Sequence, residues 1–200
     1  MSKNFQCSKI WAIVPAAGIG KRMGSSIPKQ YLPIGNGTVL EYTLEKLLAL
    51  DAIEGVILSL ADNDEYWLRS HLYRHPKIHI APGGKERSDS VLSGINYLLN
   101  SLEHNQSGED VWALVHDAAR PCVSIERVQA LISQVLIKAE HKFPCGGILA
   151  VPAADTIKRA DGEGDVEATE DRSLLWHAHT PQFFPVLELK RALTECARNG

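Results

Sequence analysis

Short, nearly continuous apolar runs recur along the chain and alternate with stretches in which apolar residues return every three or four positions. The continuous runs predict buried β-strands over 10–14, 55–60, 77–81, 111–115 and 147–151. The spaced residues, with Asp62 and Ser124 as N-caps, predict helices over 39–50, 62–72, 86–102 and 124–139. This alternation predicts one α/β domain over residues 1–200, with a mostly parallel, doubly wound sheet flanked by helices.

Residues 153–173 interrupt the alternation. The segment is rich in Asp, Glu, Gly, Lys and Arg and offers little that could join a core. Two interpretations are open, a solvated surface loop and an extended arm that reaches a second subunit. Composition alone favours the loop.

Composition and charge narrow the class of partner. The 200 residues carry 21 Lys and Arg against 24 Asp and Glu, so the net charge is −3 and the basic excess typical of nucleic-acid or membrane binding is missing. No apolar run approaches the roughly 20 residues that cross a bilayer, and the first residues lack the apolar stretch of a secretory signal. We therefore expect a cytoplasmic protein with reduced, mostly buried thiols at four isolated positions, Cys7, Cys122, Cys145 and Cys196.

The loop after the first predicted strand carries the strongest chemical signal. It reads Pro15-Ala16-Ala17-Gly18-Ile19-Gly20-Lys21-Arg22-Met23, and Pro28-Lys29-Gln30-Tyr31-Leu32 follows it. Small residues let backbone N–H groups approach a phosphate, and three cations come close behind them. The alternative, a tight turn with solvated charges, explains one Gly-x-Gly more easily than the whole combination. The loop therefore predicts a triphosphate site.

Two common phosphate-binding patterns do not fit this loop. The P-loop requires Gly-x4-Gly-Lys followed by Ser or Thr, which is absent. The dinucleotide pattern requires a third glycine where Met23 stands, and an acidic residue about 20 positions later at a strand end. Glu41 is the only acid near that distance and does not end a strand. A dehydrogenase is therefore disfavoured.

Four later segments combine with this loop into a specific resemblance. The chain resembles the 2-C-methyl-D-erythritol 4-phosphate cytidylyltransferase family of the non-mevalonate isoprenoid pathway. The matching segments are Gly83-Gly84-x-Glu86-Arg87-x-Asp89-Ser90-Val91, His116-Asp117-Ala118-Ala119-Arg120-Pro121, Asp155-Thr156-x-Lys158-Arg159 and Trp176-His177-Ala178-x-Thr180-Pro181-Gln182.

The resemblance implies a fold and a reaction. The fold would be a Rossmann-like nucleotidyltransferase with 153–173 as an extended β-arm, paired in a homodimer whose arms reach the neighbouring site. The reaction would be a Mg²⁺-dependent transfer of CMP from CTP to 2-C-methyl-D-erythritol 4-phosphate, which releases pyrophosphate and gives 4-diphosphocytidyl-2-C-methyl-D-erythritol.

The resemblance also implies roles for single residues. The catalytic cations would be Arg22, Lys29 and Arg172. Nucleotide binding would fall to Pro15, Ala16, Ala17, Gly18, Gly84, Ser90, Asp117 and Ala118. The acceptor pocket would contain Arg120, Thr156, Arg172 and Thr180. Mg²⁺ would be held through the CTP phosphates, with Asp117 as a candidate ligand.

Plainer interpretations exist for some of these residues. Asp117 could only cap a turn, Ser90 could be an ordinary polar residue early in a helix, and Arg172 could be solvated. His71, His75 and His79 recur every four residues, but Pro76 would break a helix that placed them on one face, so a zinc site is disfavoured.

The sequence departs from the family pattern at two places. Lys85 stands where the family usually has an acidic residue beside the base-reading glycine, and family members continue past residue 200 with a further strand that carries a site lysine. These departures leave a catalytically silent nucleotide-binding dimer open as an alternative. A cytidylyltransferase acting on ribitol 5-phosphate stays open as well, because it would share the nucleotide motifs and differ mainly in the acceptor pocket.

Overall fold

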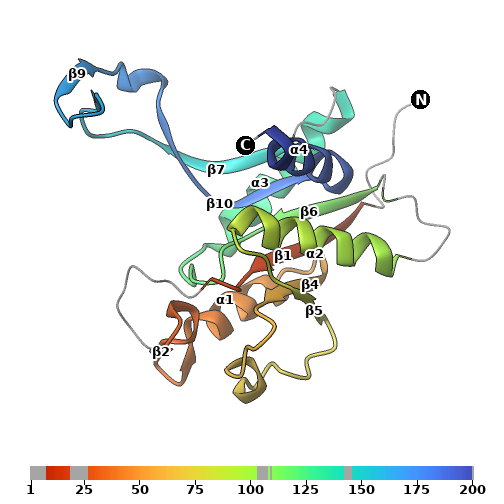
Figure 1. Ribbon diagram of the computed structural model, residues 1–200. Helices are drawn as coiled ribbons and strands as arrows, with labels where there is room; N and C mark the ends of the chain where they lie inside the picture. The colour runs from red at the N-terminus through yellow and green to blue at the C-terminus, as the bar shows by residue number, and fades with distance from the viewer. Residues whose placement is uncertain (1–7, 19–26, 103–107, 109, 142–145, 200) are drawn as a thin grey trace.

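A six-stranded sheet forms the centre of the protein, with helices on both of its faces (Figure 1). The computed structural model describes residues 8–18, 27–102, 108, 110–141 and 146–199. From one edge to the other, the strands are β5 (Ile78–Pro82), β4 (Ile53–Leu60), β1 (Lys9–Pro15), β6 (Val111–Val115), β10 (Trp176–Pro185) and β7 (Gly147–Pro152).

The pairing of these strands confirms the predicted α/β architecture. The first four strands of that order run parallel, whereas β10 is antiparallel to both β6 and β7. All five predicted strands are present, each within two residues of its predicted ends. The sequence did not predict β10, which lies between β6 and β7.

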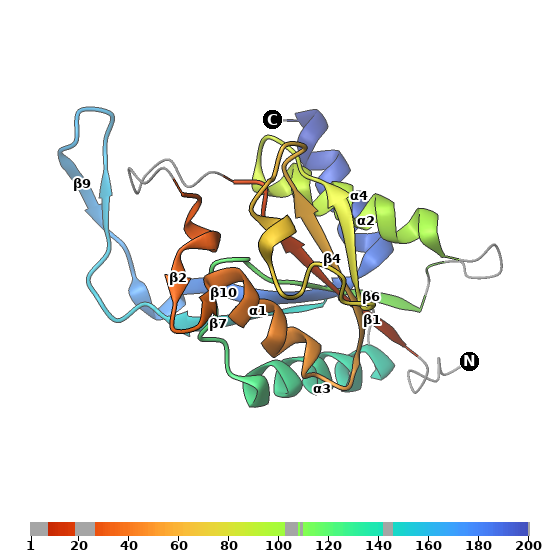
Figure 2. The ribbon, with the colours of Figure 1, turned by 90° about the horizontal axis from the view of Figure 1, so that it is seen from below.

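The central strands are covered on both faces, which explains their continuous apolar runs. Ala12 and Val14 of β1 belong to one buried cluster, with residues of α1 (Val39–Leu48) and α3 (Ile125–His141). Ile13 belongs to a second cluster, with residues of α2 (Arg87–Ser101) and α4 (Val186–Asn199). Figure 2 shows the two helix pairs on opposite sides of the sheet. Among the described residues, no helix has the length and apolar content needed to cross a bilayer.

Polar caps fix where the helices begin. Thr38 and Glu41 form a capping box on α1: the Glu41 N–H donates to Thr38 Oγ1 at 3.3 Å, and the Thr38 N–H donates to Glu41 Oε2 at 2.7 Å. Ser124 accepts the Arg127 N–H at 3.3 Å, which confirms it as the N-cap of α3.

The predicted helix over 62–72 is wrong. The segment consists of turns and one short 3-10 helix, η4 (Trp67–Arg69). Asp64, rather than Asp62, accepts the N–H groups at its start, those of Tyr66 and Trp67. Trp67 and Leu72 are buried but Leu68 is 59% exposed, although positions 68 and 72 would share a helix face. The buried positions are therefore anchors of a loop.

Residues 153–173 form an ordered hairpin, as the resemblance implied, and not the loop that composition favoured. β8 (Lys158–Ala160) pairs antiparallel with β9 (Val166–Thr169), and η5 (Arg172–Leu174) leads back to β10. The hairpin projects well away from the sheet (Figure 1). We call 153–173 the arm.

A second small hairpin connects the first strand to α1. It consists of β2 (Pro33–Ile34) and β3 (Gly37–Thr38), which follow the 3-10 helix η3 (Lys29–Tyr31). The expectation of buried thiols is wrong for Cys122 and Cys196, which are free and exposed. Cys7 and Cys145 lie outside the described residues.

The Glu41 carboxylate joins the start of α1 to the loop that contains η4. Besides the Thr38 N–H, it accepts hydrogen bonds from Ser70 Oγ at 2.7 Å and from the His71 N–H at 3.1 Å. Burial raises its pKa, but the hydrogen bonds from Ser70, Thr38 and His71 outweigh burial and hold the pKa below its ordinary value of 4.5. The carboxylate is therefore ionised at neutral pH.

We predict that Glu41→Gln lowers the free energy of unfolding by about 2 kcal/mol at pH 7, because an amide cannot accept all of these bonds. A depressed folded-state pKa contributes stability that is present above the unfolded pKa and is lost as the pH falls through the folded value. The difference in the free energy of unfolding between wild type and variant should therefore become smaller below pH 4.5. Urea unfolding at several pH values measures this difference. A difference that does not change with pH would contradict the stabilising role of the ionised Glu41 carboxylate.

Candidate active site

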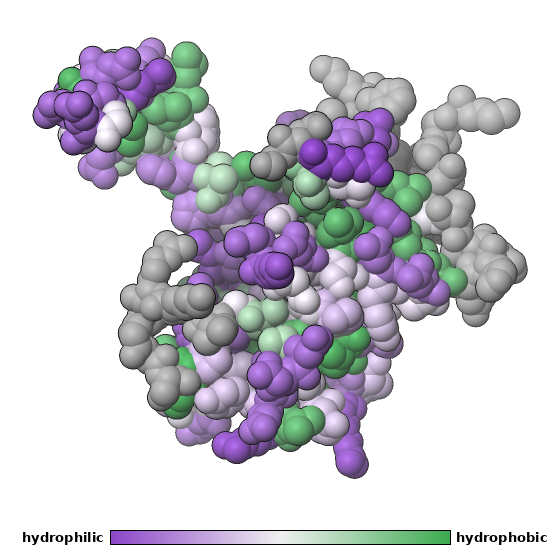
Figure 3. Space-filling view, viewed as in Figure 1, coloured by the Kyte–Doolittle hydropathy of each residue, from purple (hydrophilic) through white to green (hydrophobic). Residues whose placement is uncertain are grey.

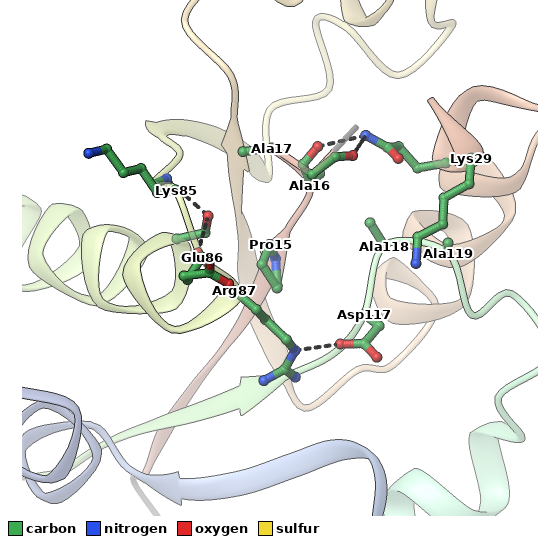
Figure 4. Close-up of a pocket in the computed structure, with 14 residues that line it drawn as sticks. Pro15, Ala16, Ala17, Lys29, Lys85, Glu86, Arg87, Asp117, Ala118 and Ala119 are labelled. Atoms are coloured by element: carbon green, nitrogen blue, oxygen red, sulfur yellow. Dashed lines mark hydrogen bonds and ion pairs between the residues drawn. The ribbon is translucent and has the colours of Figure 1, made fainter. Parts of the chain in front are cut away.

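A cleft of about 190 Å³ opens at the carboxyl ends of the parallel strands (Figure 4). Ligands of open α/β sheets bind at this edge. The loops after β1, β5 and β6 and the turn η3 supply its walls: Pro15, Ala16, Ala17, Gly18, Lys29, Gln30, Gly84, Lys85, Glu86, Arg87, Ser90, Asp117, Ala118 and Ala119.

The loop after β1 is held by hydrogen bonds on both of its sides. The Ala16 N–H donates to the Ser59 carbonyl of β4 at 2.8 Å. On the other side, the Gln30 side-chain amide donates to the carbonyls of Ala16 at 2.7 Å and Gly18 at 3.2 Å. Lys29, next to Gln30, lines the same cleft. A cation and a loop of small residues thus face one space.

The start of α2 forms the opposite wall. The Gly84 N–H donates to Ser90 Oγ at 3.0 Å, and this hydroxyl donates to the Glu86 carbonyl at 3.2 Å. Ser59 Oγ donates to the Ser90 carbonyl at 2.8 Å, which ties the helix to β4. Ser90 is only 3% exposed, so its hydroxyl shapes this wall from within. The positive end of the α2 dipole lies beside the cleft, where it favours an anion.

Asp117 lies between two arginines. Its Oδ1 is 2.8 Å from Arg87 Nε and its Oδ2 is 2.9 Å from Arg120 Nε. Burial raises the pKa of Asp117, but the hydrogen bonds and charge of the two guanidinium groups outweigh burial and lower it. Each carboxylate oxygen therefore binds one arginine and keeps a further lone pair.

Buried His116 fixes the turn that carries Asp117 and Arg120. Its ring Nε2 lies 3.1 Å from the Arg120 carbonyl oxygen, and its backbone N–H donates to the Ile13 carbonyl of β1 at 3.0 Å. Burial lowers the pKa of His116, so the ring is neutral at pH 7 and donates through Nε2. Its role here is structural support.

Comparison with known proteins identifies the family. The family model described as "IspD: 2-C-methyl-D-erythritol 4-phosphate cytidylyltransferase" matches residues 10–200. The chain belongs to this family. The enzyme of that name from Pseudomonas putida is 46% identical over 187 residues, which cover 93% of this chain and 75% of the relative. The enzyme of that name from Shewanella frigidimarina is 50% identical over 185 residues, which cover 92% of this chain and 75% of the relative.

Solved structures agree with the sequence match. The crystal structure of Francisella tularensis 2-C-methyl-D-erythritol 4-phosphate cytidylyltransferase has a TM-score of 0.76 to this chain at 35% identity. The superposition covers 96% of this chain and 79% of that structure. The crystal structure of a 4-diphosphocytidyl-2C-methyl-D-erythritol synthase also has a TM-score of 0.76, at 37% identity, and the superposition covers 94% of this chain and 79% of that one.

The cleft brings together all eight nucleotide-binding residues that the resemblance implied for this family member, and Lys29 with them. Arg22 lies outside the described residues. Of the acceptor residues, Arg120 pairs with Asp117, and Thr180 Oγ1 accepts the Asp117 N–H at 3.3 Å. Thr156 and Arg172 are exposed on the arm, where Arg172 donates to the Ala154 carbonyl. The described lining of the cleft includes neither of the two.

Sequence reasoning gave no role to Gln30 and left two roles open for Arg87, an anchor of the site or of a helix terminus. Gln30 directly follows Lys29 in the segment Pro28-Lys29-Gln30-Tyr31-Leu32, but the sequence does not reveal that its side chain is buried. The Arg87 guanidinium reaches an acid 30 positions away, a pairing that spacing along the chain does not reveal.

A metal centre made of protein ligands alone does not occur in the described part of the chain. No group of three His, Cys, Asp or Glu side chains there could hold an ion. His71 contacts Glu41 and Glu45, whereas His79 packs against Trp11 with ring centroids 5.5 Å apart. Since Mg²⁺ in nucleotide enzymes is bound mainly by phosphates, one or two carboxylates and water, this cleft is compatible with Mg²⁺ that arrives with a triphosphate.

We predict that Gly84→Ala disturbs the wall opposite Lys29. A Cβ at this position would lie 2.2 Å from Asp89 Cβ and 3.0 Å from the Asp89 carbonyl carbon, so the start of α2 would have to move. We expect a loss of about 1–3 kcal/mol in stability and weaker nucleotide binding. Thermal unfolding and calorimetry with CTP measure both effects.

Gly162→Ala is the matched control, because a Cβ there meets nothing within 4 Å. Equal effects of the two changes would show that the close contact at Gly84 is unimportant.

Proposed function

We propose that this protein transfers CMP from CTP to 2-C-methyl-D-erythritol 4-phosphate, releasing pyrophosphate and giving 4-diphosphocytidyl-2-C-methyl-D-erythritol. The observation that carries the proposal is the cleft itself. It combines a small-residue loop, the cation of Lys29 and the start of α2, in a chain that belongs to this family. We expect the reaction to take place in the cytoplasm.

The reaction is a displacement at the α-phosphorus of CTP. An oxygen of the acceptor phosphate forms a new bond to that phosphorus, and the bond to the bridging oxygen of the β-phosphate breaks. Pyrophosphate leaves with the electron pair, while negative charge grows on the α-phosphate oxygens. Lys29 would stabilise this charge, and Arg22 would do the same by family resemblance. Mg²⁺ would neutralise charge on the CTP phosphates.

The two ends of the nucleotide would meet different walls. The triphosphate would lie along the backbone of 15–18 and beside Lys29, where small side chains permit close approach. The cytosine would lie near Gly84 and Ser90, and Asp117 and Ala118 would border the ribose. Because the Ser90 hydroxyl is already bonded to Gly84 and Glu86, its contribution would be to orient the base-binding wall.

Two arginines beside the cleft suit the phosphate of the acceptor. Arg87 and Arg120 are 45% and 53% exposed, and both bind Asp117 through Nε. Each guanidinium has four further N–H donors, which suit phosphate oxygens. Thr180, bonded to the Asp117 backbone, would border the same pocket. The family match favours methylerythritol phosphate over ribitol 5-phosphate as the acceptor.

The arm would complete this pocket in a second subunit. It stands apart from the body in Figure 3, with polar and apolar side chains side by side. Val166, Leu174 and Trp176, on the arm and at its base, are 64%, 80% and 61% exposed. Large apolar side chains exposed along the arm and at its base suit a surface that a partner covers. A homodimer would bury them and bring Thr156 and Arg172 to the neighbouring cleft.

Pyrophosphate release from CTP and Mg²⁺ tests the function. We expect turnover with methylerythritol 4-phosphate, a much smaller rate with ribitol 5-phosphate, and about a hundredfold lower kcat in Lys29→Ala, since one cation at a developing charge is worth about 3 kcal/mol. Lys138→Ala, on the exposed side of α3, is the charge-matched control. A preference for ribitol 5-phosphate would reassign the acceptor, and CTP binding without turnover would favour the silent dimer.

Mixing two inactive variants tests the arm in trans. In a heterodimer of Lys29→Ala and Arg172→Ala, one of the two sites would combine an intact cleft with an intact arm. Since about half of randomly formed dimers are heterodimers, about a quarter of the wild-type activity should return. Mixing after denaturation and refolding, with the double variant as control, measures this. Absence of recovery would place Arg172 in the site of its own subunit or outside any site.

A further inference from the structure

Gln30 is a buried side-chain amide at the edge of the cleft. It lies in η3 between Lys29 and Tyr31 and is only 3% exposed. Its Nε2 is 2.7 Å from the Ala16 carbonyl oxygen and 3.2 Å from that of Gly18. Because both partners can only accept, the NH₂ end of the amide must face them, and its two N–H groups match the two carbonyls.

These bonds fix the direction of a backbone N–H. A trans peptide is planar, so the Ala16 carbonyl and the Ala17 N–H point in opposite directions. With the carbonyl bound to Gln30, the Ala17 N–H points away from Gln30. No acceptor for this N–H lies among the described residues. Ala17 lines the cleft, and in Figure 4 Ala16 and Ala17 lie between Lys29 and Lys85.

The turn that carries Gln30 is itself anchored. The Tyr31 hydroxyl donates to Asp64 Oδ2 at 2.8 Å, and the Tyr31 ring stacks on Tyr66 with centroids 5.1 Å apart. Asp64 in turn accepts the N–H groups that start η4. Gln30 thus connects the loop after β1 to a fixed support, and the same short turn places Lys29.

We propose that Gln30 is a positioning residue that sets the backbone of 15–18 to receive the triphosphate of CTP. It touches no reacting atom. By binding the carbonyls of Ala16 and Gly18, it leaves the backbone N–H of Ala17 to face the phosphates. It also keeps this loop at a fixed position relative to Lys29. The inference rests on the proposed function, because it names CTP as the ligand of this loop.

Substitutions of similar size separate positioning from packing. Gln30→Met keeps most of the volume and removes the donors, and Gln30→Glu is almost isosteric but would set a carboxylate against two carbonyls. In both variants we expect the KM for CTP to rise about tenfold, while the KM for the acceptor changes less than about twofold. CTP affinity of Gln30→Glu should recover as the pH falls, because protonation of the new carboxyl restores one donor.

Tyr31→Phe is the matched control. It removes one hydrogen bond of η3 but keeps the ring stack on Tyr66 and the Gln30 amide, so it should lower the unfolding temperature without the selective effect on CTP. The proposal is overturned if both Gln30 variants keep the wild-type KM for CTP. It is equally overturned if Tyr31→Phe raises that KM as much, or if both substrates are affected alike.

A measurement on the ligand-free protein separates this proposal from the proposed function. The NMR order parameter of the Ala17 amide should fall from about 0.85 in the wild type towards 0.6 in Gln30→Met. An unchanged order parameter would refute the positioning role of Gln30 even if CTP is turned over. A lowered one would support it even if the wild type failed to release pyrophosphate, a result that would remove the proposed function alone.

Discussion

Burial of the central strands on both faces is the constraint on which the rest of the structure depends. β1 lies between β4 and β6 and runs parallel to both, with Ile13 in one core and Ala12 and Val14 in the other. A polar group that lacks a hydrogen-bond partner is costly within such strands, so the groups that meet a ligand lie at their ends. Since parallel strands end at one edge, the loops after β1, β5 and β6 meet in a single cleft.

Charge is organised around Asp117 at that edge. Arg87 and Arg120 would repel each other if no anion lay between them, and the carboxylate supplies the compensating charge. One arginine belongs to α2 and the other to the turn after β6, so the ion pairs also join two walls of the cleft. An incoming phosphate can use the remaining donors of both guanidinium groups without leaving an unpaired charge behind.

Residues 16–18, directly after β1, are held by hydrogen bonds to their backbone. Ser59 of β4 holds them from one side and Gln30 from the other. Pre-organised N–H groups bind an anion more tightly than mobile ones, because the entropy of ordering is lost on folding and not on binding. Small side chains alone would allow the close approach of a phosphate but would not fix the direction of the N–H groups.

The sequence by itself determined five of the six strands of the main sheet, most helices and the edge at which the cleft opens, because burial on one or two faces leaves a periodic pattern in the letters. It misjudged 62–72, where Trp67 and Leu72 anchor a loop, and it missed β10, whose Pro181 falls in the gap in pairing between Ala178 and Gln182. Tertiary structure alone decided the pairing of Arg87 with Asp117 and the bond from Gln30 to Ala16. These contacts join residues 30 and 14 positions apart, and only the packing of the sheet sets the distance between them.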